Sequence, residues 1–287
     1  MQILEKHIVP QQKKPIRLQE YAVGVFKTVA TKSAIKKAIR KELILVNEIS
    51  TSTAHIVMSG DIITLLKSTE ENNYKPLRLT LEVIYEDDFL AVINKPAGIL
   101  VSGNKFKTID NALLQNLQKS TQSDAVRPRP VHRLDYPTTG LLLIGKTSTS
   151  ILALNQLFEK KEIQKTYHAI SIGHMEKEGI VSLDIDEKEA HSSFKVLKSV
   201  TSKRFVVLNL VKLRPNTGRR HQLRKHLSSI GNPILGDKDY AKEGLLLKGK
   251  GLYLHASELE FTHPNTNKKM IIKNKLPKKF TKIFPNY

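Results

Sequence analysis

Most of the chain is a series of short runs rich in valine, isoleucine and leucine, and two longer helical patterns interrupt them. These runs have the length and composition of β-strands, and they lie at residues 83–96, 140–147, 165–173, 193–200 and 204–213. In the first run, a Glu-Asp-Asp sequence indicates the turn of a hairpin. Apolar residues at helical spacing predict helices at 150–161 and 219–230, the second ending at Gly231. The order lacks the regular alternation of a doubly wound sheet, so the sequence predicts a mixed α+β domain.

A polar stretch at residues 68–78 has neither helical nor strand periodicity and contains Pro76. Such a composition is typical of a linker. We therefore expect a small domain at residues 1–67, a linker at 68–78 and a larger domain at 79–287.

The charge balance indicates the kind of partner. The chain contains 47 Lys and Arg against 27 Asp and Glu, a formal net charge of +20 at pH 7, and both regions are net basic. This excess favours a polyanion, because cationic side chains release the counterions condensed on phosphates. No apolar run is long enough to span a membrane, and the N-terminus lacks the apolar core of a signal peptide. The absence of cysteine excludes disulfides, thiol catalysis and cysteine-ligated zinc. We expect a monomeric cytoplasmic protein.

In the first region, residues 33–43 predict an amphipathic helix with Ile35 and Ile39 on its apolar side. The opposite side is cationic throughout and consists of Lys36, Lys37, Arg40 and Lys41. A solvated surface of a packed helix is one interpretation. Like charges one turn apart repel each other, however, and a phosphate backbone opposite them would relieve that repulsion. The helix is therefore a candidate RNA-binding surface.

This region also resembles the small RNA-binding domain named after ribosomal protein S-four. The similar segments are Arg-Leu-Gln-Glu-Tyr at residues 17–21, the helical stretch at 33–47, and Ser-Gly-Asp-Ile-Ile-Thr-Leu at 59–65. Gln19 replaces the usual aspartate. The resemblance implies a small α/β domain that binds RNA.

The densest polar motif of the second region runs from residue 129 to 146. A basic loop leads to Asp135, and a Tyr-Pro-Thr-Thr-Gly turn then enters an apolar run. An aspartate before such a turn often bonds only nearby backbone amides. Gly140 to Thr147 match the phosphate-loop pattern, but the four variable positions are Leu, Leu, Leu and Ile. That composition predicts a strand rather than a loop, so we reject nucleotide binding.

The sequence His-Arg-Leu-Asp-Tyr-Pro-Thr-Thr-Gly at 132–140 resembles the catalytic signature of the RluA-type family of RNA pseudouridine synthases. Further similar blocks occur in the family's order at 86–101, 165–173, 215–240 and 252–264. The resemblance therefore covers nearly all of residues 79–287. Thr139 stands where the family usually has serine, and Arg220 where threonine is common.

The resemblance implies an α+β catalytic domain with a mainly antiparallel central sheet and an RNA-binding cleft. It makes Asp135 the catalytic aspartate and Tyr167 the tyrosine that packs on the target base. It makes Arg224 the cation paired with Asp135, which would keep the carboxylate ionised. Leu223 is then a candidate for the apolar floor of the pocket. Isomerisation of uridine involves no net oxidation, so no cofactor or metal is expected.

Other polar residues of these blocks are candidates for substrate binding, namely His132, Arg133, Lys165, Arg220 and His221. The two histidines lack further ligands at metal-binding spacing, so we interpret them as RNA contacts or structural hydrogen-bond donors. Lys95 is interpreted as structural or phosphate-binding rather than catalytic.

Several alternatives stay open. Asp135 could attack the sugar or remove a proton from it. The chain could instead be a non-catalytic RNA-binding or ribosome-assembly protein, although pure binding does not require a carboxylate in a basic cleft. A methyltransferase would need a glycine-rich cofactor loop, which the sequence lacks. Ribosomal RNA is favoured over transfer RNA as the target.

Overall fold

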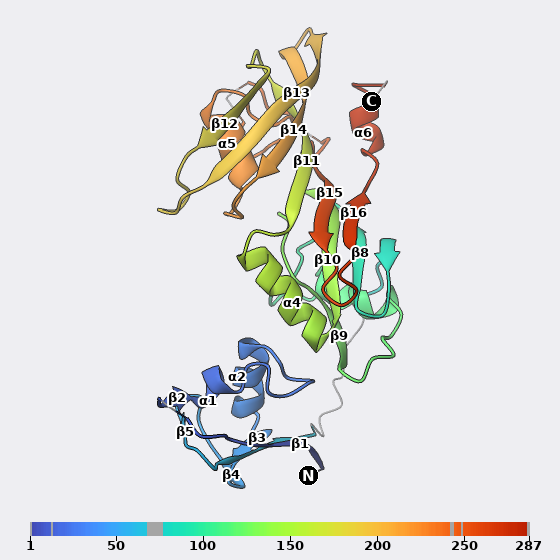
Figure 1. Ribbon diagram of the computed structural model, residues 1–287. Coiled ribbons are helices and arrows are strands. Elements are labelled where there is room, and N and C mark those ends of the chain that lie inside the picture. The colour runs from blue at the N-terminus through green and yellow to red at the C-terminus, as the bar shows by residue number, and fades with distance from the viewer. Residues whose placement is uncertain (1, 13, 68–76, 242–243, 248, 286–287) are drawn as a thin grey trace.

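The computed structural model of the protein describes residues 2–12, 14–67, 77–241, 244–247 and 249–285 (Figure 1). Most of the predicted linker, residues 68–76, lies outside the described residues. Its role as a domain boundary stays a prediction.

The N-terminal region forms a four-stranded antiparallel sheet in the order β1-β6-β3-β4, with a separate β2–β5 pair. Its elements are β1 (Ile3–Ile8), β2 (Ile16–Arg17), α1 (Leu18–Tyr21), α2 (Lys32–Arg40), β3 (Ile44–Val46), β4 (Ile49–Ser50), β5 (Ile56–Val57) and β6 (Ile62–Leu66). The predicted amphipathic helix is confirmed in α2. Ile35 and Ile39 are buried in the core of this region, and the Thr31 side chain caps the helix by accepting from the Ala34 amide at 3.2 Å.

The second region is built on one ten-stranded sheet. Along its main path the order is β12-β13-β14-β11-β15-β10-β8-β7, while β16 pairs with β15 and β9 with β10. The strands are β7 (Glu82–Glu86), β8 (Leu90–Lys95), β9 (Ala125–Pro130), β10 (Thr139–Thr147), β11 (Gln164–Ile172), β12 (Glu178–Ser182), β13 (His191–Ser202), β14 (Val206–Pro215), β15 (Leu254–Thr262) and β16 (Lys269–Lys273). All pairs are antiparallel except β10 with β15. The predicted mixed fold with a mainly antiparallel sheet is confirmed.

Strand β10 runs through the middle of the hydrophobic core. Leu142 and Ile144 belong to the cluster on one face of the sheet, and Leu141 and Leu143 to the cluster on the other. A strand buried on both faces has a continuous apolar sequence, which explains the run of leucines. Because this stretch is a strand, the rejection of a phosphate loop is confirmed.

The two long helices of this region lie close to their predicted positions. Helix α4 (Ser148–Glu159) begins with a capping box in which Thr147 and Ser150 satisfy each other's backbone amides. Helix α5 (Gln222–Ser229) begins three residues later than expected, because His221 has a left-handed backbone (φ 55°) that cannot belong to the helix. It ends before Gly231, as predicted.

The lysine-rich C-terminal stretch at residues 268–284 is part of the folded domain. Its first half forms β16, which pairs with β15, and its second half contains α6 (Lys278–Thr281). Phe280 and Phe284 are buried in the main core. Although its many lysines are typical of a solvated tail or a contact surface, this stretch is not a solvated tail. Burial of these two phenylalanines stabilises the stretch on the core despite the surrounding lysines.

Within the described residues, no helix is long and apolar enough to span a membrane.

Gly140 lies where β10 approaches β15 closely, and a substitution there tests this approach. Its φ is +114°, and a Cβ atom there would lie 2.2 Å from the Ala256 backbone oxygen. We expect Gly140→Ala to lower the free energy of unfolding by roughly 2–5 kcal/mol, through backbone strain and overpacking together. Denaturant unfolding measures the loss.

Gly103→Ala is the matched control, since Gly103 also has positive φ (+133°) but no atom lies within 4 Å of its added Cβ. It should lose only the strain contribution. Equal losses in both variants would contradict the close approach of β10 and β15 as the cause.

Candidate active site

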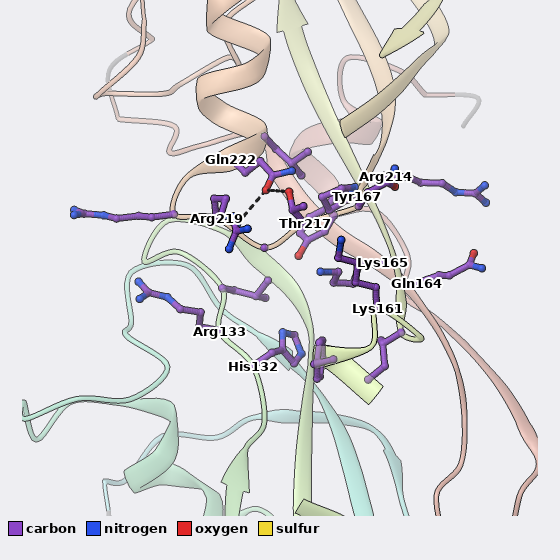
Figure 2. Close-up of a pocket in the computed structure, with 18 of the residues that line it drawn as sticks. His132, Arg133, Lys161, Gln164, Lys165, Tyr167, Arg214, Thr217, Arg219 and Gln222 are labelled. Atoms are coloured by element: carbon purple, nitrogen blue, oxygen red, sulfur yellow. Dashed lines mark hydrogen bonds between the residues drawn. The ribbon is translucent and has the colours of Figure 1, made fainter. Parts of the chain in front are cut away.

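A cleft of about 1230 Å³ opens beside the central strands. Three segments provide most of its lining: the loop at 131–138, the chain from the end of α4 into β11 at 158–167, and the loop from β14 into α5 at 214–223. Residues of β13 and β15 complete it. Figure 2 shows Arg133 and Arg219 on one side of the cleft and Lys161 and Lys165 on the other. The signature segment at 132–140 thus meets parts of the similar blocks at 165–173 and 215–240 in one place.

Asp135 lies in the loop that precedes β10, and it lines the cleft. Its backbone carbonyl accepts from the Thr138 amide at 3.0 Å, which closes the predicted turn. The Asp135 side chain is 17% exposed. The carboxylate is therefore mostly shielded from water but accessible from the cleft.

Lys95 holds this loop through hydrogen bonds to its backbone carbonyls. Its ammonium group is fully buried and donates to the carbonyls of Pro96, Asp135, Tyr136 and Thr138 at 2.9–3.3 Å. Burial lowers the pKa of Lys95 to about 8, although nearby Asp135 opposes the shift, so the ammonium form predominates at neutral pH. Of the two interpretations of Lys95, the contacts favour the structural one.

Tyr167 lies on β11 and lines the cleft, with 9% of its surface exposed. A bulge in the pairing with β15 falls between Thr166 and Tyr167, and bulges redirect side chains in this way. Burial, assisted by the Asp135 charge, raises the pKa of Tyr167. The phenol is therefore neutral and faces the same cleft as the aspartate.

The expected pairing of Arg224 with Asp135 is wrong. The Arg224 guanidinium is 2% exposed and binds the Asp237 carboxylate through two hydrogen bonds, at 2.7 and 2.6 Å. It also binds Asp239 at 2.6 Å. Among the described residues no ion pair joins Arg224 to Asp135, and Arg224 does not line the cleft. A buried guanidinium requires a bidentate partner, and fully buried Asp237 provides it.

His221 lies next to Asp135 instead. Its Nε2 atom is 3.9 Å from the Asp135 carboxylate oxygen. Its Nδ1 atom is 2.9 Å from the Tyr240 hydroxyl. Burial lowers the pKa of His221, and Arg224 and Arg220 lower it further against the opposing effect of Asp135. The imidazole beside the aspartate is therefore neutral at neutral pH.

His132 contributes to the cleft wall as a structural acceptor. Its Nε2 accepts from the Leu143 amide at 2.9 Å, and its ring packs on Phe158 with centroids 4.8 Å apart. Burial, together with the charge of Lys165, lowers the pKa of His132 to about 3. The structural interpretation of His132 is therefore favoured over a charged RNA contact.

The remaining candidates of this region also line the cleft, and they are Arg133, Lys165, Arg220 and Leu223. Sequence reasoning missed three further cations there, Lys161, Arg214 and Arg219. The one sequence signal for them is their position next to the predicted strands and helices. Among the described residues, no group of His, Asp and Glu could hold a metal ion.

Gln222 was also missed, and it fixes the loop that carries Arg219 and Arg220. Its side-chain oxygen accepts from the Thr217 hydroxyl (2.6 Å) and the Arg219 amide (3.0 Å), as Figure 2 shows. Its nitrogen donates to the His191 carbonyl at 2.9 Å, and at the same distance to the Ser192 hydroxyl. One buried amide thus attaches the loop to β13.

The four cations predicted for the N-terminal domain do not line the cleft. Lys37, Arg40 and Lys41 are exposed on α2 and at its end. Lys36 is half-buried and its charge acts on Glu20, which also pairs with Lys32 at 2.5 Å. Part of the expected repulsion is therefore compensated within the domain.

Lys95→Met tests the support of the Asp135 loop. The apolar side chain leaves buried carbonyls without their donor, and we expect the free energy of unfolding to fall by roughly 2–4 kcal/mol. Lys105→Met, at an exposed loop position, should change it by less than about 0.5 kcal/mol. A similarly small loss at Lys95, measured by denaturant unfolding, would rule out this role.

Comparisons with known proteins show the family of the chain. Residues 89–229 match the family model described as RNA pseudouridylate synthase. Ribosomal large subunit pseudouridine synthase C of Rickettsia bellii is 32% identical, over 93% of this chain and 96% of the relative. tRNA pseudouridine synthase C of Vibrio parahaemolyticus is 30% identical, over 72% of this chain and 95% of the relative.

A solved structure, human RNA pseudouridylate synthase domain containing 4, is similar with a TM-score of 0.56 and 26% identity, over 70% of this chain and 90% of that one. These relationships identify an isomerase that acts on RNA, and they favour it over a non-catalytic RNA-binding protein or a methyltransferase. The chain belongs to the RluA-type family of RNA pseudouridine synthases.

Proposed function

We propose that this enzyme isomerises uridines of large-subunit ribosomal RNA with Asp135 as the catalytic carboxylate. The observation that carries the proposal is the shielded Asp135 carboxylate in a cleft bordered by cations and shared with Tyr167. Asp135 is the one aspartate among the residues that line this cleft. A uridine seated there would bring its glycosidic bond to that carboxylate.

The reaction breaks the bond between nitrogen and the ribose carbon, turns the uracil and rejoins it through carbon. Asp135 either attacks the anomeric carbon or removes a proton from the sugar, and both routes use the carboxylate anion. The Tyr167 ring offers a flat surface against which the free base turns. Leu223 contributes an apolar contact to the same cleft, so the base would be held close to the sugar between the two bond changes.

The uracil must turn between the two bond changes, which a base stacked in a helix cannot do, so the target uridine must leave its stack. Unstacking costs roughly a few kcal/mol, and least in loops, so a hairpin loop should be a better substrate than a duplex. The cations around the cleft would then hold the flanking phosphates.

Two observations favour ribosomal RNA. The Rickettsia relative, whose name specifies the large ribosomal subunit, matches 93% of the chain. The Vibrio relative, whose name specifies tRNA, matches 72%, about the share occupied by residues 79–287. The additional N-terminal region, as an S-four-like domain, would contact the longer RNA. Mapping pseudouridines in RNA from cells with and without the gene tests the target.

Asp135→Asn should abolish product formation while leaving the fold and RNA affinity largely intact. The amide occupies the same turn but offers neither a nucleophilic nor a basic oxygen near neutral pH, so we expect a loss of at least roughly 10³-fold. Tritium release from carbon five of labelled uridine measures turnover, and a binding titration runs alongside. Asp184→Asn, at an exposed aspartate, should retain wild-type turnover. An Asp135→Asn variant with near wild-type release would refute the proposal.

The double variant Lys37→Gln/Arg40→Gln tests RNA binding by α2. We expect weaker binding to a long ribosomal RNA fragment, unchanged turnover on a short stem-loop, and a salt dependence whose log–log slope is shallower by about 1–2. Lys198→Gln/Lys203→Gln removes the same charge from exposed positions on and beside β13. If both pairs of substitutions weaken binding equally, the effect reflects net charge and not a site on α2.

A further inference from the structure

His221 has a backbone conformation that its residue type rarely adopts. Its φ of 55° and ψ of 24° are left-handed, and it directly precedes α5. Few non-glycine residues adopt this conformation, histidine more often than most, and where it persists it often lies at a functional site. The imidazole is 17% exposed, and its Nε2 atom lies 3.9 Å from the Asp135 carboxylate. His221 is not among the residues that line the cleft, whereas Arg220 and Gln222 on either side of it are.

Tyr240 fixes the ring of His221. The Tyr240 hydroxyl lies 2.9 Å from Nδ1, and the two rings meet edge to face with centroids 5.7 Å apart. Tyr240 is itself held by the Arg224 guanidinium, which lies 4.9 Å from its ring centroid. Because Arg224 is anchored on Asp237 and Asp239, a connected set of contacts leads from the interior to the imidazole.

The charges around His221 determine which nitrogen carries the proton. The titratable groups that act on it are Asp135, Arg224, Arg220 and Asp239, and the Tyr240 hydroxyl contacts Nδ1. If the phenol donates to Nδ1, the neutral ring carries its proton on Nε2, which faces the Asp135 carboxylate. The opposite tautomer would direct a lone pair at an anion. Electrostatics therefore favour an Nε2–H group pointing at Asp135.

We propose that His221 is a positioning residue for Asp135, whose Nε2–H group donates to the carboxylate and fixes its direction toward the uridine sugar. The proposal rests on the function proposed for Asp135. The present separation of 3.9 Å exceeds a hydrogen bond. Catalytic hydrogen bonds are often long in the free enzyme and shorten when substrate binds. Among the described residues, His221 is the basic side chain within 4.0 Å of the Asp135 carboxylate. In this arrangement, a neutral imidazole takes the place expected for Arg224.

Two substitutions of His221 distinguish the role of its Nε2 atom from that of its Nδ1 atom. The His221→Gln side chain can present an amide N–H near the position of Nε2, whereas that of His221→Asn reaches only as far as Nδ1. Asparagine tolerates the left-handed backbone well, so the Asn variant should fold, and thermal unfolding verifies this. We expect His221→Asn to lower kcat by about 10- to 100-fold, the range for loss of a charge-assisted hydrogen bond, with KM nearly unchanged. His221→Gln should recover most of kcat.

Tyr240→Phe is a second, independent variant, because it frees the ring of His221 without altering the histidine. We expect a decrease in kcat of several-fold, again with little change in KM. The Asp135→Asn enzyme in the same tritium-release assay distinguishes the two claims. If Asp135→Asn is active, the proposed function fails.

If Asp135→Asn is inactive but His221→Asn turns over at the wild-type rate, only the positioning role fails. A rise in KM with intact kcat in both His221 variants would show an RNA contact and overturn the proposal. Equal losses of kcat in the Gln and Asn variants would also overturn it, because the donor at the Nε2 position would then be irrelevant.

Discussion

The active site depends on one buried ammonium group. Lys95 lies at the end of β8 and donates to the carbonyls of Asp135, Tyr136 and Thr138 in the loop that precedes β10. Strands β8 and β10 are neighbours in the sheet. The lysine therefore transfers the rigidity of the sheet to a loop that has little regular structure of its own. Carbonyl oxygens converge on the cation, which orients the backbone and leaves the aspartate side chain directed to the cleft.

Other buried charged side chains form ion pairs within the protein, and they are distinct from the cations that border the cleft. Arg224 satisfies Asp237 and Asp239 and takes no part in lining the cleft. Lys146 likewise pairs with Glu86 at 2.6 Å, where β10 and β7 end. The cations that border the cleft are drawn from loops and strand ends. The interior thus holds compensated pairs, while excess positive charge is placed where a phosphate backbone can approach.

Periodicity and family blocks predicted six of the ten strands of the sheet, both long helices, and the meeting of Asp135 with Tyr167 in one cleft. They did not predict which of several possible partners a long side chain binds. Asp237 and Asp239 lie in a loop without periodicity, so nothing in the sequence indicated that they would bind Arg224 in preference to Asp135. The same limit applies to Gln222, whose four contacts come from residues that only the tertiary fold assembles. The start of α5 was misplaced because a left-handed histidine has no sequence signature.

The Gln222 amide has a consequence for how the enzyme responds to its ionic surroundings. The contacts that hold the 217–222 loop on β13 are uncharged and buried, so dissolved ions do not weaken them. Arg219 and Arg220 on the same loop face solvent, where ions screen their attraction for phosphates. On the function proposed above, salt would therefore weaken the capture of RNA without changing the shape of the cleft that would receive the uridine. The charged side chains would then control how long the enzyme stays on RNA, and the buried hydrogen bonds would control the geometry of the site.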